Sequence, residues 1–149
     1  MGHHIRAVAG EREAVLALSR GWVEAQVVEL PQDSALLFLT DGLWEQIEEA
    51  FPGPEGPDCP VLVAWDGAVS RFLREGSRDH PLGYIETDYF GGHGTQAAVL
   101  LEGGEVVLGP VEGEGTINRV LRALGVVSQA GKDEFDTLGL GSYRHMEPF

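Results

Sequence analysis

The chain has 149 residues, of which 43% are hydrophobic, with 21 glycines and one cysteine. This length and composition predict one globular domain that buries a core without disulfides or metal ions, and they exclude a disordered chain. The 24 acidic and 10 basic side chains give a formal net charge of -14. Direct binding of nucleic-acid phosphates is therefore not expected, because that affinity comes from Lys and Arg. The acidic charge favours a basic protein partner, or high solubility alone.

The cellular location is predicted from what the sequence lacks. The stretch from Met1 to Gly10 has no apolar core of signal-peptide length, and no apolar run is long enough to cross a bilayer. The lone Cys59 cannot form an internal disulfide, which fits a reducing compartment. These features predict a cytoplasmic protein that does not associate with membranes.

The first part of the chain reads as strands and helices in alternation. Apolar runs predict strands over residues 5–8, 26–30 and 35–39, and residues with helical spacing predict helices over 11–22 and 41–51. In the second of these helices, Leu43, Ile47 and Phe51 recur every four residues, and glutamates occupy the opposite face. This pattern is typical of a helix that covers a core with one face.

The middle of the chain is harder to interpret. Residues 51–60 are rich in proline and glycine. We expect a surface loop there, and not a linker between two domains, because domains smaller than roughly 50 residues are seldom stable alone. Five apolar residues between 62 and 73 then keep helical spacing, which favours a helix over 62–75. Asp66 and Gly67 interrupt that run, so a strand and turn over 61–65 stays open as an alternative.

The second half predicts three consecutive antiparallel strands and a final helix. Aromatic, β-branched and apolar runs place the strands at 84–90, 96–101 and 105–108, with Gly103 and Gly104 as a two-residue hairpin turn. Apolar residues at i, i+3, i+4 and i+7 from Ile117 predict a helix over 116–125. The glycine-punctuated tail from Asp133 to Arg144 carries apolar residues that are expected to pack it against the body.

These elements predict an α+β domain spanning residues 1–149. Its antiparallel sheet is expected to contain five or six strands, including the meander, and about four helices should pack mainly on one face. Seven apolar side chains are expected in the core: Leu43, Ile47, Phe72, Val99, Val120, Leu121 and Leu124.

The first turn of the meander is the most unusual stretch. Gly91, Gly92 and Gly94 surround His93, a composition suited to backbone at positive φ or to close approach by a ligand or another chain. A strand, and not a helix, follows this turn, so it does not fit a phosphate-binding loop, and a tight or bulged hairpin is favoured over a binding loop for phosphate. The candidate binding residues in and around the turn are Glu86, Asp88, Tyr89, Phe90, Gly91, Gly92, His93, Gly94 and Gln96.

Acidic residues on the preceding strand offer a chemical alternative. Strand alternation puts Tyr84, Glu86 and Asp88 on one face with His93 just beyond, and two carboxylates with an imidazole can hold a divalent metal or act as acid and base. Carboxylates two residues apart lack the specific spacing of a zinc site, so a solvated sheet face is favoured. We assign no catalytic or metal-ligating residue and expect no cofactor.

Three stretches of the second half resemble a known group of proteins. Residues 89–99 (YFGGHGTQAAV), 117–126 (INRVLRALGV) and 133–144 (DEFDTLGLGSYR) together resemble small uncharacterised bacterial proteins. Those proteins combine a Y-F-G-G-x-G-x-Q stretch with a C-terminal D-E-F-D-x-x-G-L-G-x-x-R. The likeness covers the chain from about residue 85 onward and is weaker before it. The resemblance implies a shared fold, with a shared interaction surface as a further expectation, and it carries over no catalytic residue.

Size, charge and the lack of a catalytic motif favour a non-enzymatic protein-binding domain. Toxin-immunity proteins, which neutralise a basic partner, are the nearest analogy. A small hydrolase or metal-dependent enzyme using Glu86, Asp88 and His93 is the alternative. Mimicry of DNA is a third interpretation, and it requires the carboxylates to line one continuous face.

Overall fold

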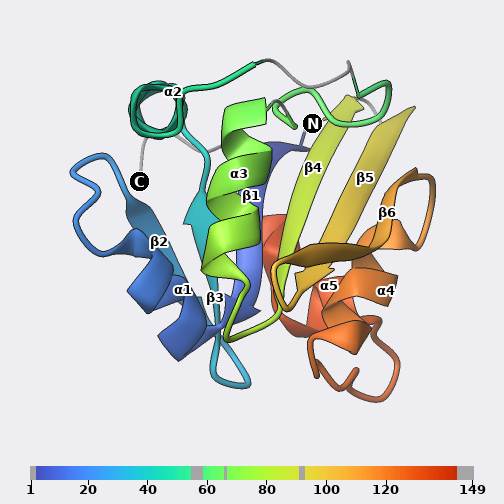
Figure 1. Ribbon diagram of the computed structural model, residues 1–149. Helices are drawn as coiled ribbons and strands as arrows, with labels where there is room; N and C mark the ends of the chain where they lie inside the picture. Colours follow the sequence, from blue (N-terminus) through green and yellow to red (C-terminus); the bar gives the residue numbers. More distant parts are fainter. Residues whose placement is uncertain (1–2, 55–58, 66, 91–92, 144–149) are drawn as a thin grey trace.

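Figure 1 shows the computed structural model, which describes residues 3–54, 59–65, 67–90 and 93–143. Six strands form a single sheet in the order β2-β3-β1-β4-β5-β6, and every neighbouring pair is antiparallel. The strands are β1 (His3–Glu11), β2 (Gln26–Leu30), β3 (Ser34–Phe38), β4 (Leu82–Phe90), β5 (His93–Glu102) and β6 (Glu105–Glu112).

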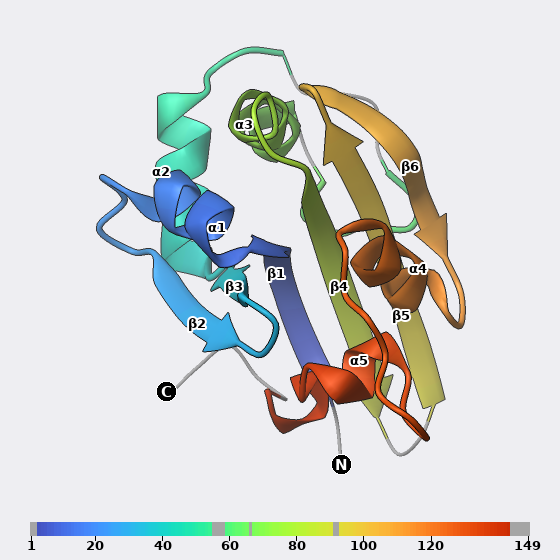
Figure 2. The same cartoon turned by 90° about the horizontal axis from the view of Figure 1, so that it is seen from below.

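Helices cover both faces of this sheet (Figure 2). One face carries α1 (Arg12–Ser19), α2 (Asp41–Ala50) and α3 (Gly67–Gly76), and we call it the α3 face. The other, the α4 face, carries α4 (Thr116–Ala123), the short α5 (Glu134–Thr137) and the 3-10 turn η1 (Leu140–Ser142). The predicted α+β class and meander are confirmed, and three of the four helices with seven or more described residues share one face.

Burial on both faces explains the composition of the central strands. In β3, all five residues from Ser34 to Phe38 are buried. In β1, Ile5 and the run from Ala7 to Gly10 are buried as well. A strand covered on both faces reads as a continuous apolar run, because every side chain enters a core whichever way it points. The sheet therefore separates two hydrophobic cores, one beneath each group of helices.

The predicted helix over 62–75 is wrong in its first part. Helix α3 begins at Gly67, and residues 61–65 form a turn without helix or strand pairing. Leu62 and Ala64 are nevertheless buried in the α3-face core. The helical spacing of Leu62 and Trp65 therefore reflects a loop that packs against the core, and Asp66 lies outside the described residues.

The core prediction is confirmed for all but one residue. Leu43, Ile47, Phe72, Val99, Val120 and Leu121 are each at most 4% exposed. Leu124 is only partly buried, because it caps the C-terminus of α4 at the margin of the α4-face core. Gly83 of β4 lets α4 approach, since a Cβ there would lie 2.5 Å from Val120 Cγ1.

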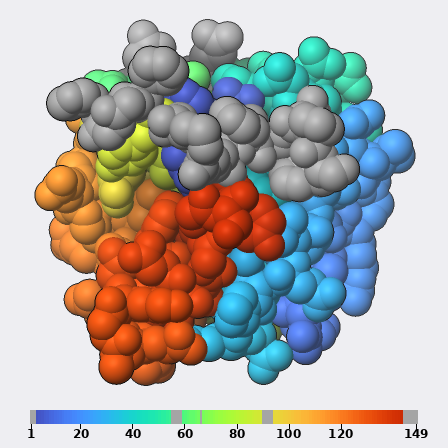
Figure 3. All heavy atoms as spheres, turned by 180° about the vertical axis from the view of Figure 1, so that it is seen from behind, coloured from blue at the N-terminus to red at the C-terminus, as the bar shows by residue number. Residues whose placement is uncertain are grey.

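Polar contacts bind the C-terminal segment, residues 126–143, to the rest of the domain. Arg122 Nε donates to Glu134 Oε1 at 2.8 Å, which ties α5 to α4. This hydrogen bond holds the pKa of Glu134 below its usual range, although desolvation opposes the effect. Gln32 binds both backbone groups of Val127, donating at 2.8 Å and accepting at 2.9 Å. The segment therefore covers the middle of the α4 face, as Figure 3 shows in red.

The β5–β6 turn matches its expectation. Gly103 and Gly104 have φ values of 63° and 82°, and Glu102 pairs with Glu105 across them. Two consecutive positive φ angles define the type I′ turn that suits a two-residue hairpin. Within the described ranges, no helix combines the length and the apolar character that a bilayer crossing requires.

Candidate functional site

The predicted binding residues of β4 and β5 divide between the two faces of the sheet. Arg6 pairs with Glu86 and His4 with Asp88, whereas Gln96 pairs with Thr87. Because successive strand residues point to opposite faces, Glu86 and Asp88 lie on the α3 face, and Tyr89 and Gln96 lie on the α4 face. The residues that were predicted as one cluster therefore lie in two separate pockets.

The glycine turn is described only in part. The backbones of Phe90 and His93 pair with each other, but their side chains, like Gly91 and Gly92, lie outside the described residues. Gly94 has a φ of 156°, and a Cβ at this position would collide with the Asp88 carbonyl oxygen. A glycine is therefore required where β5 begins.

Replacing Gly94 with alanine is expected to lower the free energy of unfolding by at least about 2 kcal/mol, through backbone strain and displacement of β4. Urea denaturation measures this change. Gly141→Ala is the matched control, because Gly141 has no neighbour within 4 Å and no positive φ. Equal stabilities of the two variants would contradict the close approach of β4 and β5 at Gly94.

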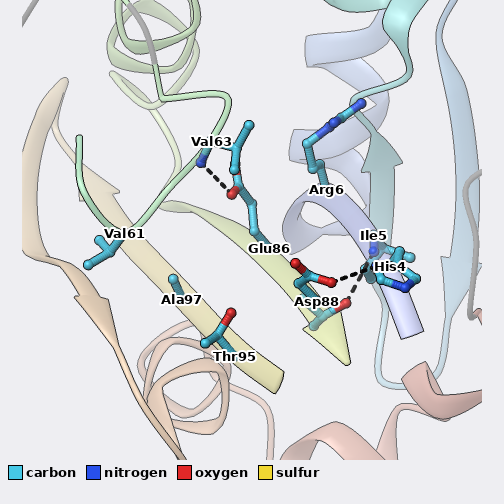
Figure 4. Close-up of a pocket in the computed structure, with 10 residues that line it drawn as sticks. His4, Ile5, Arg6, Val61, Val63, Glu86, Asp88, Thr95 and Ala97 are labelled. Atoms are coloured by element: carbon cyan, nitrogen blue, oxygen red, sulfur yellow. Dashed lines mark hydrogen bonds and ion pairs between the residues drawn. The ribbon is translucent and has the colours of Figure 1, made fainter. Parts of the chain in front are cut away.

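The α3 face carries a pocket of about 210 Å³, drawn in Figure 4. Strands β1, β4 and β5 form its floor and the turn over 61–65 forms one wall. We call it the α3-face pocket. Its lining residues are His4, Ile5, Arg6, Val61, Val63, Glu86, Thr87, Asp88, Thr95 and Ala97.

Glu86 accepts three hydrogen bonds within this pocket. Its Oε1 accepts a hydrogen bond from the Val63 N–H at 2.6 Å, and its Oε2 accepts from the Ala64 N–H at 2.9 Å. The buried hydroxyl of Tyr84 donates to Oε2 as well, at 2.7 Å. Glu86 is 8% exposed, so these bonds replace most of its hydration. The carboxylate therefore holds the turn on the sheet, and its oxygens are committed to that role.

The other charged groups of the pocket are paired at its rim. His4 Nδ1 lies 2.9 Å from Asp88 Oδ1, with side chains that are 46% and 75% exposed (Figure 4). Arg6 donates to Asp41 Oδ1 at 3.0 Å and lies 5.3 Å from the ring centroid of Trp44. Asp41 begins α2 and is 88% exposed. One exposed carboxylate, Asp88, thus lines the pocket, and a second, Asp41, is bound to the lining residue Arg6.

Tyr89 and Gln96 belong to a second pocket, on the α4 face. Gln96 Nε2 donates to the Tyr89 hydroxyl at 3.0 Å, and Gln96 Oε1 accepts from the Ile117 N–H at 3.2 Å. The volume of this α4-face pocket is about 230 Å³. It is lined by His3, Thr87, Tyr89, Gln96, Asn118, Asp133 and Phe135.

Sequence reasoning missed several residues of both pockets. His3, His4 and Arg6 enter them because β1 pairs with β4, an association between segments about 80 residues apart that no local pattern encodes. Val63 was assigned to a helix, and Asn118 was counted only as part of one. Asp133 and Phe135 lie in the stretch DEFDTLGLGSYR that carries the resemblance, but nothing in the sequence placed them beside Tyr89 and Gln96.

Comparison of the chain with protein-family models, with curated proteins and with solved structures found no match. In the part of the chain that the structure describes, no three His, Cys, Asp or Glu side chains are grouped closely enough to hold a metal ion. The geometry of the two pockets is therefore the basis for a functional proposal.

Proposed function

We propose that this protein is a non-enzymatic protein-binding domain that engages a basic partner through the rim of the α3-face pocket. The observation that carries the proposal is Val63, a residue that is 78% exposed although its backbone N–H is bound by Glu86. An apolar side chain on a turn that is already fixed loses little conformational entropy when a partner covers it. Such preorganised apolar groups are suited to the centre of an interface.

The charges around Val63 favour a basic partner. Asp88 lines the pocket, Asp41 is bound to the lining residue Arg6, and α2 adds exposed Glu45, Glu48 and Glu49 beyond Asp41. Negative groups at a rim accelerate association with a positive surface and exclude acidic competitors. An immunity-like role, in which the domain neutralises a basic toxic protein in the cytoplasm, agrees with this surface and with the net charge of -14.

The enzymatic alternative has weaker support. A hydrolase or metal-dependent enzyme would use Glu86, Asp88 and His93, yet both oxygens of Glu86 accept internal hydrogen bonds. A general base needs a lone pair directed at its substrate. Of the three residues, this leaves Asp88 as the described carboxylate with an exposed side chain, because the side chain of His93 lies outside the described residues.

The proposal is tested by producing each protein encoded beside this chain's gene in a bacterial host, with and without the chain. We expect one basic product to be toxic alone and tolerated with the chain, and to bind it in isothermal titration calorimetry. Val63→Lys should weaken that binding at least about tenfold, because it removes the apolar contact and places a positive charge against a basic partner.

Val127 offers a matched control for this substitution. It is 70% exposed, its backbone is held by Gln32, and it lies at the opposite end of β1 from the α3-face pocket. Val127→Lys should change the Kd less than about twofold. Equal losses from the two variants, or the absence of any basic partner among the neighbouring products, would refute the proposal.

A further inference from the structure

The α4-face pocket brings together the three stretches that carry the sequence resemblance. Tyr89 and Gln96 come from the first stretch, Asn118 from the second, and Asp133 and Phe135 from the third. The volume of about 230 Å³ lies below the ~300–1,000 Å³ of sites for drug-sized ligands. The pocket therefore has room for one small ring.

Backbone donors determine the orientation of both amide side chains in this pocket. The Ile117 N–H donates to Gln96 Oε1, and the Phe135 N–H donates to Asn118 Oδ1 at 2.8 Å. Because a backbone N–H can only donate, the amide oxygens are assigned without ambiguity. Each amide nitrogen therefore occupies the other position of its planar group, away from the N–H that binds the oxygen.

The two amide groups and the Tyr89 hydroxyl retain hydrogens to donate. Gln96 Nε2 donates one hydrogen to Tyr89, and Asn118 Nδ2 donates one to Asp133 Oδ2 at 3.1 Å. The second N–H of each amide has no acceptor among the described residues, and neither has the O–H of Tyr89, whose oxygen accepts from Gln96. The pocket thus presents three neutral donors.

Asp133 supplies the complementary acceptor. It is exposed, and its two oxygens accept one hydrogen bond each, from Asp136 N–H at 2.8 Å and from Asn118. A carboxylate has about four lone-pair sites, so about two remain for a ligand. The Phe135 ring, 5.5 Å from the His3 ring, provides an apolar wall.

We propose that the α4-face pocket binds a neutral polyhydroxylated ring, such as a single monosaccharide unit. Each sugar hydroxyl both donates and accepts, which matches three donors beside one carboxylate. The C–H face of a pyranose is apolar and can lie against Phe135. An anion would be repelled by Asp133 and by the net charge of -14, and a cation would leave the three donors unmatched. This site lies on the opposite face from Val63 and does not depend on the proposed protein partner.

The test is a titration followed by ¹⁵N–¹H NMR with glucose, galactose, mannose and N-acetylglucosamine. Glucuronate and glucosamine serve as charged comparators, and sorbitol serves as an acyclic one. At least one neutral sugar should bind with a millimolar Kd and shift the side-chain amide signals of Gln96 and Asn118. Binding by none of the neutral sugars, or only by a charged comparator, would overturn the proposal.

Two variants locate the binding without removing the contacts that hold the segment. Tyr89→Phe removes one donor and keeps the ring, and Phe135→Leu keeps an apolar group and removes the flat face. Each should weaken the affinity of the bound sugar about tenfold. Asp88→Asn, on the opposite face, should leave it within about twofold. Unchanged affinity in both pocket variants would place the sugar elsewhere and reject this site, and the backbone spectrum reports whether each variant is folded.

Discussion

Replacing Glu86 with alanine is expected to lower the free energy of unfolding by about 3–5 kcal/mol. The substitution leaves three donors without an acceptor, namely the N–H groups of Val63 and Ala64 and the hydroxyl of Tyr84. Tyr84 is fully buried, so water cannot easily replace the lost bond. Urea denaturation followed by tryptophan fluorescence measures the effect, because Trp65 stacks on Tyr84 with 6.1 Å between ring centroids.

Two comparisons isolate the role of the buried carboxylate. Glu86→Gln keeps one acceptor oxygen but places an amide group against a donor, so its stability should fall between those of the parent and Glu86→Ala. Asp88→Asn should change stability by less than about 0.5 kcal/mol, because the Asp88 side chain is 75% exposed. If Glu86→Ala unfolds within about 1 kcal/mol of the parent, the carboxylate does not hold the turn.

The Glu86 variants also connect stability with the proposed function. The exposed position of Val63 depends on a turn that Glu86 fastens to the sheet. Under conditions where Glu86→Gln remains folded, it should bind the basic partner more weakly, because the turn must be ordered on binding. If Glu86 instead has an enzymatic role, Glu86→Gln should abolish turnover without changing the affinity for the partner.

Replacing Leu121 with alanine is expected to lower the free energy of unfolding by about 2–5 kcal/mol. Leu121 is 1% exposed and lies in the α4-face core, where no solvent can fill the cavity that the substitution leaves. Thermal and urea denaturation followed by circular dichroism measure the loss. Arg119→Ala is the control on the exposed side of α4 and should stay within about 0.5 kcal/mol of the parent.

The outcome for Leu121 bears on the whole α4 face. If Leu121→Ala melts within a degree of the parent, the apolar stripe of α4 does not pack on the sheet. The α4-face pocket would then lose its support, because Gln96 binds the first turn of that helix. A large loss of stability would confirm that α4 packs on the sheet. The sugar proposal is then decided by the NMR titration alone.

Local patterns were sufficient for the elements whose residues interact with near neighbours. The spacing of Leu43 and Ile47 predicted α2, and the Gly103–Gly104 pair predicted the β5–β6 turn. Both elements are specified within a few residues, through helical periodicity or through the positive φ angles that glycine accepts. Alternation along β4 also placed Tyr84, Glu86 and Asp88 on one face.

Long-range contacts were beyond those patterns. Residues 62–65 were assigned to the helix over 62–75, with a strand and turn over 61–65 as the alternative, because the apolar residues of this loop continue the spacing of α3. Its actual conformation depends on Glu86, which lies more than 20 residues further along the chain. The binding residues around the glycine turn were grouped by proximity in sequence, yet Tyr89 and Gln96 face away from Glu86 and Asp88.

The sequence alone therefore determined the α+β class, the meander, most of the core and the absence of a recognisable catalytic motif. Only the tertiary structure decided that β1 lies between β3 and β4, which brings His4 and Arg6 beside Glu86 and Asp88. It also decided that the C-terminal segment completes a pocket with His3 and Tyr89. The physical reason is that periodicity in the sequence indicates which side of a helix or strand is buried. Which neighbouring element covers that side depends on the packing of the whole chain.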